Sequence, residues 1–204
     1  MYSVWVIQKK WRRLWLTEKR RKKRGEGMAT WNTRGLRGST LEELINRSNE
    51  FYLEKNLALI QKIPTPITPL KIDKEHRHIT LAYFEQKSTV DYIGVVQGIP
   101  VCFDAKECTS DTFALQNIHE HQVKFMGEFE KQGGISFLVL FFSVRNELFY
   151  LPYKDMMKFW NRAQEGGRKS FRYMELDQNY YLEPKNGLFV PYLDGLAHDL
   201  ESRD

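Results

Sequence analysis

Three residues of the chain are of types that could carry out hydrolytic chemistry together: Asp91, Asp104 and Lys106. Their segment holds two short apolar runs around a glycine-containing turn, in the order 92–96, Gln97-Gly98 and 99–103. This pattern predicts a β-hairpin. Because side chains alternate along a strand, Asp104 and Lys106 should share one face, and Asp91 opens the first strand at the same end. Two acids beside an amine in an apolar hairpin are costly unless they are paired or bound to a metal.

The same alternation divides the second strand into two faces. We expect Cys102 to lie on the face of Asp104 and Lys106, and the other face to carry Val101, Phe103 and Ala105.

One interpretation of this arrangement is a hydrolytic Mg²⁺ site, with Mn²⁺ as a substitute. The carboxylates of Asp91 and Asp104 and the carbonyl of Ala105 would offer the oxygen ligands that the hard cation prefers. Lys106 would orient or deprotonate the attacking water, or offset charge on a phosphate. The alternative is an ordinary ion pair between Asp104 and Lys106 at a strand end, which is worth little at a surface. The spacing alone leaves both interpretations open.

Longer motifs around these residues resemble those of a known family. Asp91 followed by Asp104-Ala105-Lys106 resembles the P-D…(D/E)-x-K signature of restriction-endonuclease-like nucleases. More narrowly, the chain resembles the RecU family of Holliday junction resolvases from Gram-positive bacteria over roughly residues 35–195. That resemblance rests on three motifs in one order: Arg37-Gly38-x-x-Leu41-Glu42-Glu43, Lys87-Ser88-Thr89-x-Asp91-Tyr92-x-Gly94 and Leu115-Gln116-Asn117-x-His119-x-His121-Gln122. Asp104 departs from the family, which usually has Glu there; we expect activity to survive with altered metal geometry and rate.

The expected fold class is α/β, with a mixed central sheet flanked by helices, of the restriction-endonuclease-like type. Capping and apolar spacing predict helices at 40–56, 114–131, 153–163 and 172–178, and strands at 58–63, 135–142 and 147–151. Prolines force the chain out of the sheet after residue 63, and the resemblance implies that this excursion is a projecting stalk. We expect a nuclease domain at 29–204, with a stalk insertion at about 64–80 and a loose acidic end at 199–204.

Further site residues are implied by the resemblance. Glu42 matches an acid of the first helix that points at the metal, although it also suits a role as helix cap and dipole partner. Gln116 matches a glutamine beside the scissile phosphate or metal-bound water, with a solvent-facing helix residue as the alternative. Thr89, in the motif around Asp91, is a further candidate metal ligand.

Basic residues that could contact DNA phosphates occur in several places. The stalk offers Lys71, Lys74 and Arg77, and other candidates are Arg37, Lys87, Arg168 and Lys169. Each could equally be part of a solvated loop. Although the net charge is +5, residues 1–28 hold ten Lys or Arg against two Glu, so this segment carries +8 and the remainder −3. We expect residues 1–28 to be a basic arm that is disordered or not native, and Met28 is an alternative biological start.

These features together predict a Mg²⁺-dependent, structure-selective endodeoxyribonuclease that resolves Holliday junctions by symmetric nicking in recombination and DNA repair. Symmetric cuts need two sites, so we expect a homodimer. Expected partners are four-way DNA junctions, with recombinase or branch-migration proteins as further ones. Two alternatives are a non-catalytic junction-binding or recombinase-modulating module and a duplex-specific repair or restriction-type nuclease. No apolar run reaches the about 20 residues of a membrane span, and two cysteines form no disulfide framework, so we expect a cytoplasmic protein.

Overall fold

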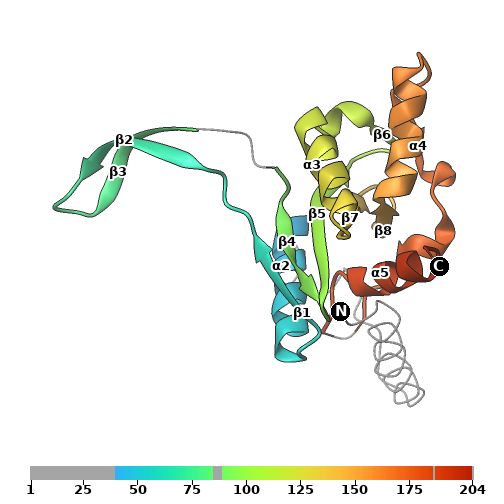
Figure 1. Ribbon diagram of the computed structural model, residues 1–204, viewed down its shortest axis with the longest axis horizontal. Coiled ribbons are helices and arrows are strands. Elements are labelled where there is room, and N and C mark those ends of the chain that lie inside the picture. Colours follow the sequence, from blue (N-terminus) through green and yellow to red (C-terminus); the bar gives the residue numbers. More distant parts are fainter. Residues whose placement is uncertain (1–39, 85–88, 186, 204) are drawn as a thin grey trace.

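A mixed β-sheet forms the centre of the computed structural model, which describes residues 40–84, 89–185 and 187–203 (Figure 1). Within these residues the sheet has six strands. Their order across the sheet is β1 (Ala58–Lys62), β4 (Tyr92–Val96), β5 (Ile99–Cys108), β7 (Ile135–Phe142), β8 (Glu147–Pro152) and β10 (Tyr181–Leu182). The pairing of β5 with β7 is parallel, and the neighbouring pairs are antiparallel. The predicted basic arm at 1–28 lies outside the described residues.

Helices cover both faces of this sheet, as the sequence predicted for an α/β domain. Helices α2 (Leu41–Glu54) and α5 (Tyr192–Glu201) contribute to the apolar core on one face. Helices α3 (Glu120–Lys131) and α4 (Tyr153–Gln164) contribute to the core on the other. The predicted alternation along β5 is confirmed, because Val101, Phe103 and Ala105 belong to the α2 side and Cys102 to the α3 side.

The predicted hairpin between β4 and β5 is confirmed together with its two-residue turn. Gln97 and Gly98 have φ angles of 49° and 90°, the left-handed values that such a turn requires at both central positions. The Gln97 side chain donates to the carbonyl of Asn56 at 2.6 Å, which ties the turn to the chain just before β1. The first helix is also confirmed, and Thr40 and Glu43 form its capping box.

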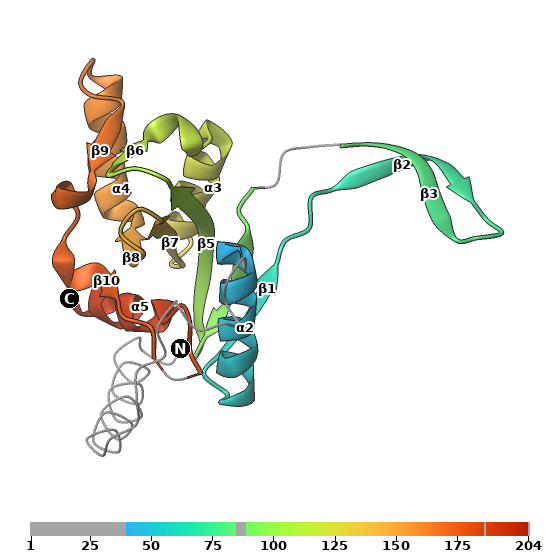
Figure 2. The same cartoon turned by 180° about the vertical axis from the view of Figure 1, so that it is seen from behind.

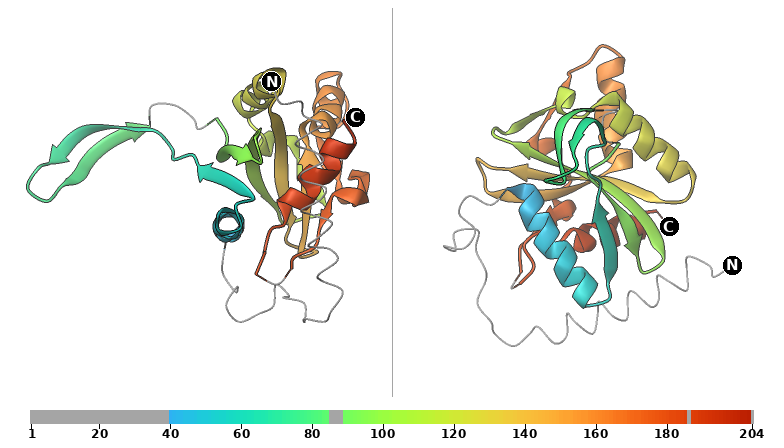
Figure 3. Two further views of the ribbon diagram at one scale, coloured as in Figure 1. Left: turned by 60° about the horizontal axis from the view of Figure 1, so that its bottom comes forward. Right: turned by 90° about the vertical axis from the view of Figure 1, so that its left-hand side faces the viewer.

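The excursion after β1 forms a separate two-stranded ribbon that projects from the body of the protein (Figures 1 and 2). Its strands are β2 (Ile67–Asp73) and β3 (His78–Phe84), so the ribbon continues past residue 80. Register shifts on either side of Lys71 interrupt the pairing close to Pro69, as expected for a residue that has no amide hydrogen. Figure 3 shows the ribbon from the side and end-on, extending away from the sheet. We call residues 67–84 the stalk.

The helix predicted at 114–131 is wrong at its start. A short strand β6 (Thr112–Ala114) pairs with β9 (Ser170–Arg172), and a single 3₁₀ turn η1 (Leu115–Asn117) follows. Only then does α3 begin, after its N-cap His119. The helix predicted at 172–178 is instead two 3₁₀ turns, η2 (Tyr173–Glu175) and η3 (Gln178–Tyr180).

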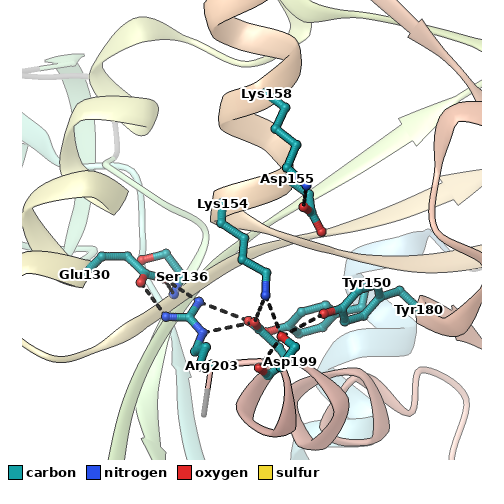
Figure 4. A network of polar contacts seen from close by, with 10 residues as sticks. Glu130, Ser136, Tyr150, Lys154, Asp155, Lys158, Tyr180, Asp199 and Arg203 are labelled. Carbon is teal, nitrogen blue, oxygen red and sulfur yellow. Dashed lines mark hydrogen bonds and ion pairs between the residues drawn. The ribbon is translucent and has the colours of Figure 1, made fainter.

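The expectation of a loose acidic end at 199–204 is also wrong. Asp199 lies on α5, is fully buried, and accepts a 3.0 Å hydrogen bond from the Tyr150 hydroxyl. Arg203 donates to Asp199 and also to Glu130 of α3, and Lys154 of α4 approaches the same aspartate (Figure 4). A buried carboxylate needs such partners. The network therefore links α3, α4, α5 and β8 at one end of the sheet.

Replacing Arg203 by Ala should destabilise the fold by about 3 kcal/mol, because it removes a charged partner from a buried carboxylate. Chemical denaturation of the purified variant measures this change. Lys131→Ala is the matched control, since it breaks an exposed ion pair with Glu128 and should leave the stability close to that of wild type. Equal losses in the two variants would contradict the role of the network.

Candidate active site

Asp91 and Asp104 lie side by side because the hairpin joins them through two hydrogen bonds. The backbone N–H of Asp91 donates to Oδ1 of Asp104 at 3.0 Å. In return, the backbone N–H of Ala105 donates to Oδ2 of Asp91 at 2.9 Å. Asp104 is fully buried, whereas Asp91 is partly exposed. Each carboxylate is thus fixed by the backbone of the opposite strand, which holds both acids at the strand end where the sequence predicted them.

Lys106 completes the predicted group. Its ammonium lies 2.5 Å from Oδ2 of Asp104, and its side chain is 18% exposed. It extends from β5 on the same face as Asp104, as the two-residue period requires. The structure therefore brings together the two acids and the amine, with Ala105 between them in the chain.

Gly94 allows the edge strand to approach this hairpin. A Cβ atom at this position would lie 2.1 Å from the carbonyl oxygen of Leu59 in β1. Strand β1 in turn pairs with β4 up to Lys62 and Tyr92, and the amide of Ile63 donates to the Asp91 carbonyl at 2.8 Å. The glycine of the motif is therefore needed for the packing that holds Asp91.

Gln122 is a site residue that the sequence analysis missed. Its Nε2 donates to both oxygens of Asp104, at 3.0 Å in each case, and the residue is 5% exposed. It reaches the acid from the third position of α3. Gln122 ends the third family motif, but a helix starting at residue 114 favoured Gln116, whereas α3 starts at Glu120.

The site has two carboxylates, of Asp91 and Asp104, but one ammonium group, of Lys106. Burial, and next the negative charge of Asp104, raise the pKa of Asp91 to about 6, while the amide of Ala105 and the ammonium of Lys106 act in the opposite direction. A partly buried carboxylate pair of this kind is stabilised by a cation. The donors are carboxylate oxygens, which suit Mg²⁺ and Mn²⁺ rather than soft metals.

The site offers few protein ligands. Across residues 40–84, 89–185 and 187–203, no group of three or more His, Cys, Asp or Glu side chains is arranged to hold a metal ion. This agrees with the habit of Mg²⁺, which keeps several waters and is commonly held by one or two carboxylates together with substrate phosphates. Asp91 and Asp104 therefore fit such a cation.

Glu42 lies on α2, and its side chain is paired with a residue outside this group. Its carboxylate forms an ion pair with Lys62 of β1, and its backbone carbonyl accepts a 3.3 Å hydrogen bond from the Tyr92 hydroxyl. The same hydroxyl lies 3.0 Å from Oδ1 of Asn46, so Tyr92 anchors α2 over the hairpin. A metal-adjacent role for Glu42 stays a prediction.

The other candidates are more peripheral. Gln116 is exposed on η1, where the amide of Leu115 donates to the carbonyl of Lys169 at 3.0 Å. Thr89 is exposed two residues before Asp91. Among the candidate DNA contacts, all those in the described part of the chain are exposed: Lys71, Lys74, Arg77, Arg168 and Lys169. Arg168 lies 3.7 Å from Glu175, and Arg37 and Lys87 lie outside the described residues.

Comparison with known proteins identifies the family. Residues 36–198, most of the chain, match the model of the RecU family, described as Recombination protein U. The chain belongs to the RecU family. The resemblance inferred from the motifs is thereby confirmed, and the matched range includes the hairpin, the stalk and α3.

Curated RecU relatives match over most of their length. A protein of Pediococcus pentosaceus is 43% identical over 173 residues, which cover 82% of this chain and 86% of the relative. Proteins of Geobacillus kaustophilus and Bacillus cytotoxicus are each 41% identical, covering 79% and 72% of this chain and 82% and 76% of the relatives. All three carry the name Holliday junction resolvase RecU.

Replacing Gly94 by Ala should destabilise the domain by about 1–3 kcal/mol, because the added methyl group forces β1 away from β4. Thermal or chemical denaturation measures the loss. Val95→Ala, at an exposed neighbour on β4, is the control and should cost clearly less. A Gly94→Ala protein as stable as the Val95→Ala protein would show that the close approach is not required.

Proposed function

We propose that this RecU-family protein is an endonuclease that resolves Holliday junctions by symmetric nicking during homologous recombination and DNA repair. We further propose that it depends on a divalent cation, Mg²⁺ in the cell and Mn²⁺ as a substitute. The observation that carries the proposal is the hydrogen-bonded pair of Asp91 and Asp104 beside Lys106. The names of its relatives, each a Holliday junction resolvase, support junction DNA as the substrate.

The cation would be held by the carboxylates of Asp91 and Asp104, with the Ala105 carbonyl and Thr89 as further candidate ligands. When bound, it would supply Lewis-acid activation of the scissile phosphate and of the attacking water. Lys106 would orient that water or take its proton, or offset the negative charge that builds up on the phosphate. The ion pair of Lys106 with Asp104 supports this role.

Two further residues have proposed supporting roles. Glu42 would act beside the metal once its carboxylate leaves Lys62 of strand β1. Gln116 would lie beside the DNA backbone, because it is exposed and the preceding residue, Leu115, is hydrogen-bonded to the loop that carries Arg168 and Lys169. Arg37 and Lys87 are retained as proposed phosphate contacts.

The stalk supports a preference for four-way junctions. It is a ribbon with its own hydrogen-bonded pairing, and its basic side chains Lys71, Lys74 and Arg77 are exposed. Apolar side chains are exposed on it as well, including Ile72 at 56% and Phe84 at 74%. A projecting element of this kind would enter the open centre of a junction and contact its phosphates.

Two symmetric cuts require two active sites, so we propose a homodimer. Light scattering of the protein bound to a junction should give twice the mass of the chain for the protein component. A single chain per junction that still makes paired cuts would contradict this arrangement. Recombinase and branch-migration proteins stay expected partners.

No helix within the described residues is long and apolar enough to cross a membrane.

Replacing Asp104 by Ala should abolish junction nicking, because half of the carboxylate pair is removed. A metal contribution of several kcal/mol corresponds to a rate loss of at least about a hundredfold. Asp104→Glu should retain nicking within about tenfold, since it keeps the charge and lengthens the side chain by one methylene. A nicking assay on a labelled four-way junction with Mg²⁺ measures both variants. A wild-type nicking rate in Asp104→Ala would contradict the proposed role of this carboxylate. No cutting by the wild-type protein with either Mg²⁺ or Mn²⁺ would contradict the proposed nuclease activity.

Replacing residues 67–84 by a short Gly-Ser linker should remove the preference for junctions over linear duplex while the unfolding midpoint stays close to wild type. The reason is that the stalk forms its own small sheet, separate from the central one. A triple Lys71→Gln, Lys74→Gln, Arg77→Gln variant keeps the ribbon and serves as a charge control. Its salt dependence of binding should weaken by about one unit of slope for each phosphate that is no longer neutralised. Unchanged junction preference without the stalk would favour a duplex nuclease.

A further inference from the structure

Arg145 and Asp111 form an ion pair beyond the ends of β5 and β7. Nε of Arg145 donates to Oδ1 of Asp111 at 2.6 Å, and Nη2 donates to Oδ2 at 2.7 Å. The guanidinium also lies over the ring of Tyr173, 4.1 Å from the ring centroid. Because the backbone N–H of Tyr173 donates to the Asp111 carbonyl at 2.8 Å, the three residues are tied together.

The ring beneath the guanidinium is anchored in the core. Phe142 and Phe149 are fully buried and contact the Tyr173 ring edge-on, with centroids 5.5 Å and 5.3 Å away. The guanidinium is thus held by a carboxylate and by a fixed ring. An arginine that is held in this way loses less conformational freedom when it binds a further partner.

The pair with Asp111 uses two of the five N–H donors of the Arg145 guanidinium. Nη1 and the second N–H of Nη2 form another edge of the planar group, which we call the outer edge and which can donate to two adjacent acceptors. The Arg145 side chain is 40% exposed. Beside it lies a pocket of about 460 Å³, lined by Thr109, Ser110, Asp111, Val144 and Arg145.

Arg145 and the stalk lie on opposite sides of the strand that carries Asp104. The stalk is inserted between β1 and β4 on one side of β5, and the β7–β8 turn with Arg145 lies on the other (Figure 1). Cys108 ends β5 four residues beyond Asp104, about 13 Å at about 3.3 Å per residue. Its carbonyl accepts from the amide of Ser143 at 2.9 Å, which places the β7–β8 turn at this end. A DNA strand that runs from the junction centre over the acid pair into a duplex arm would next meet Arg145.

The surroundings of Arg145 favour a directed contact over long-range attraction. Hydrogen bonds to Asp111 are the main cause that raises the pKa of Arg145, and the charge of Glu147 acts in the same direction. One cation beside two carboxylates attracts DNA weakly at a distance. Lys169 and Arg172, exposed at the neighbouring β9, would supply that attraction. Arg145 adds hydrogen-bond donors at a fixed position.

We propose that Arg145, held by Asp111 and Tyr173, contacts a duplex arm of the bound junction through its outer edge. The group that it binds is a pair of adjacent hydrogen-bond acceptors of DNA, either two oxygens of a phosphate or O6 and N7 of a guanine. The inference rests on the proposed function and adds a DNA contact to the residues already assigned to it.

Equilibrium binding to a labelled four-way junction, without Mg²⁺ or Mn²⁺ so that no strand is cut, tests this contact. Arg145→Lys keeps the charge beside Asp111 but removes the planar fork, so binding should weaken by about tenfold. Arg47→Lys is the matched control, because Arg47 is also exposed and lies over a ring, that of Phe189. It should bind like wild type, and both variants should keep the wild-type unfolding midpoint. Wild-type affinity in Arg145→Lys would overturn the proposal.

Two further measurements distinguish the two kinds of acceptor. Replacing the guanines of the arms by 7-deazaguanine removes N7, so a guanine contact predicts weaker binding by wild type and no further change in Arg145→Lys. A phosphate contact predicts no effect of 7-deazaguanine. It also predicts that Arg145→Gln lowers the slope of log affinity against log salt by about one unit. Weaker binding with neither effect would show an indirect, structural role and would overturn the proposal.

The binding assay is independent of strand cutting, so the two proposals can fail separately. A wild-type protein whose junction binding depends on Arg145 but which never nicks a junction with Mg²⁺ or Mn²⁺ would overturn the proposed function alone. A wild-type protein that nicks junctions, with Arg145→Lys binding equally well, would overturn the Arg145 contact alone.

Discussion

The pair of cross-strand hydrogen bonds between Asp91 and Asp104 is the constraint on which the site depends. Each acid is held by an amide of the facing strand, so two negative charges are kept close together in a poorly hydrated place. Such an arrangement is unfavourable by itself. Lys106 and Gln122 offset part of that cost on Asp104, and a divalent cation would offset the rest.

The rest of the fold keeps this hairpin in place. Strand β5 is paired on both sides, antiparallel to β4 and parallel to β7, so Asp104 lies deep in the sheet. Helix α3 covers that face and supplies Gln122, while α2 covers the opposite face and is tied down by the Tyr92 hydroxyl. The polar network around Asp199 holds the C-terminal helix against the same sheet. The site is thus built on central, rigid elements, and the stalk is attached at the edge.

Local sequence pattern was sufficient to predict the hairpin and the grouping of its acids. The period of two decides which side chains share a face, and Gln97-Gly98 specifies the turn, so Asp104 and Lys106 could be placed without a structure. Gln122 could not be placed in this way, because its contact with Asp104 depends on where α3 begins and how it packs. The early 3₁₀ turn interrupts the apolar pattern that suggested a longer helix.

The prediction of a loose C-terminal end was wrong for a related reason. Asp199 is followed within five residues by Glu201, Arg203 and Asp204 and so resembles a solvated tail, yet it is buried against Tyr150, 49 residues earlier in the chain. Partners at such distances leave no local signature. The stalk is an intermediate case: its prolines marked an excursion from the sheet, whereas the pairing of β2 with β3 up to Phe84 required the structure.

The most direct test of this account is a crystal structure of the wild-type protein soaked in Mn²⁺, with the ion located by its anomalous signal. The account predicts an ion bound by carboxylate oxygens of both Asp91 and Asp104, with the Lys106 ammonium displaced from Asp104 and the Gln122 amide still in place. An ion bound elsewhere, or an undisturbed Lys106–Asp104 pair at saturating Mn²⁺, would contradict it.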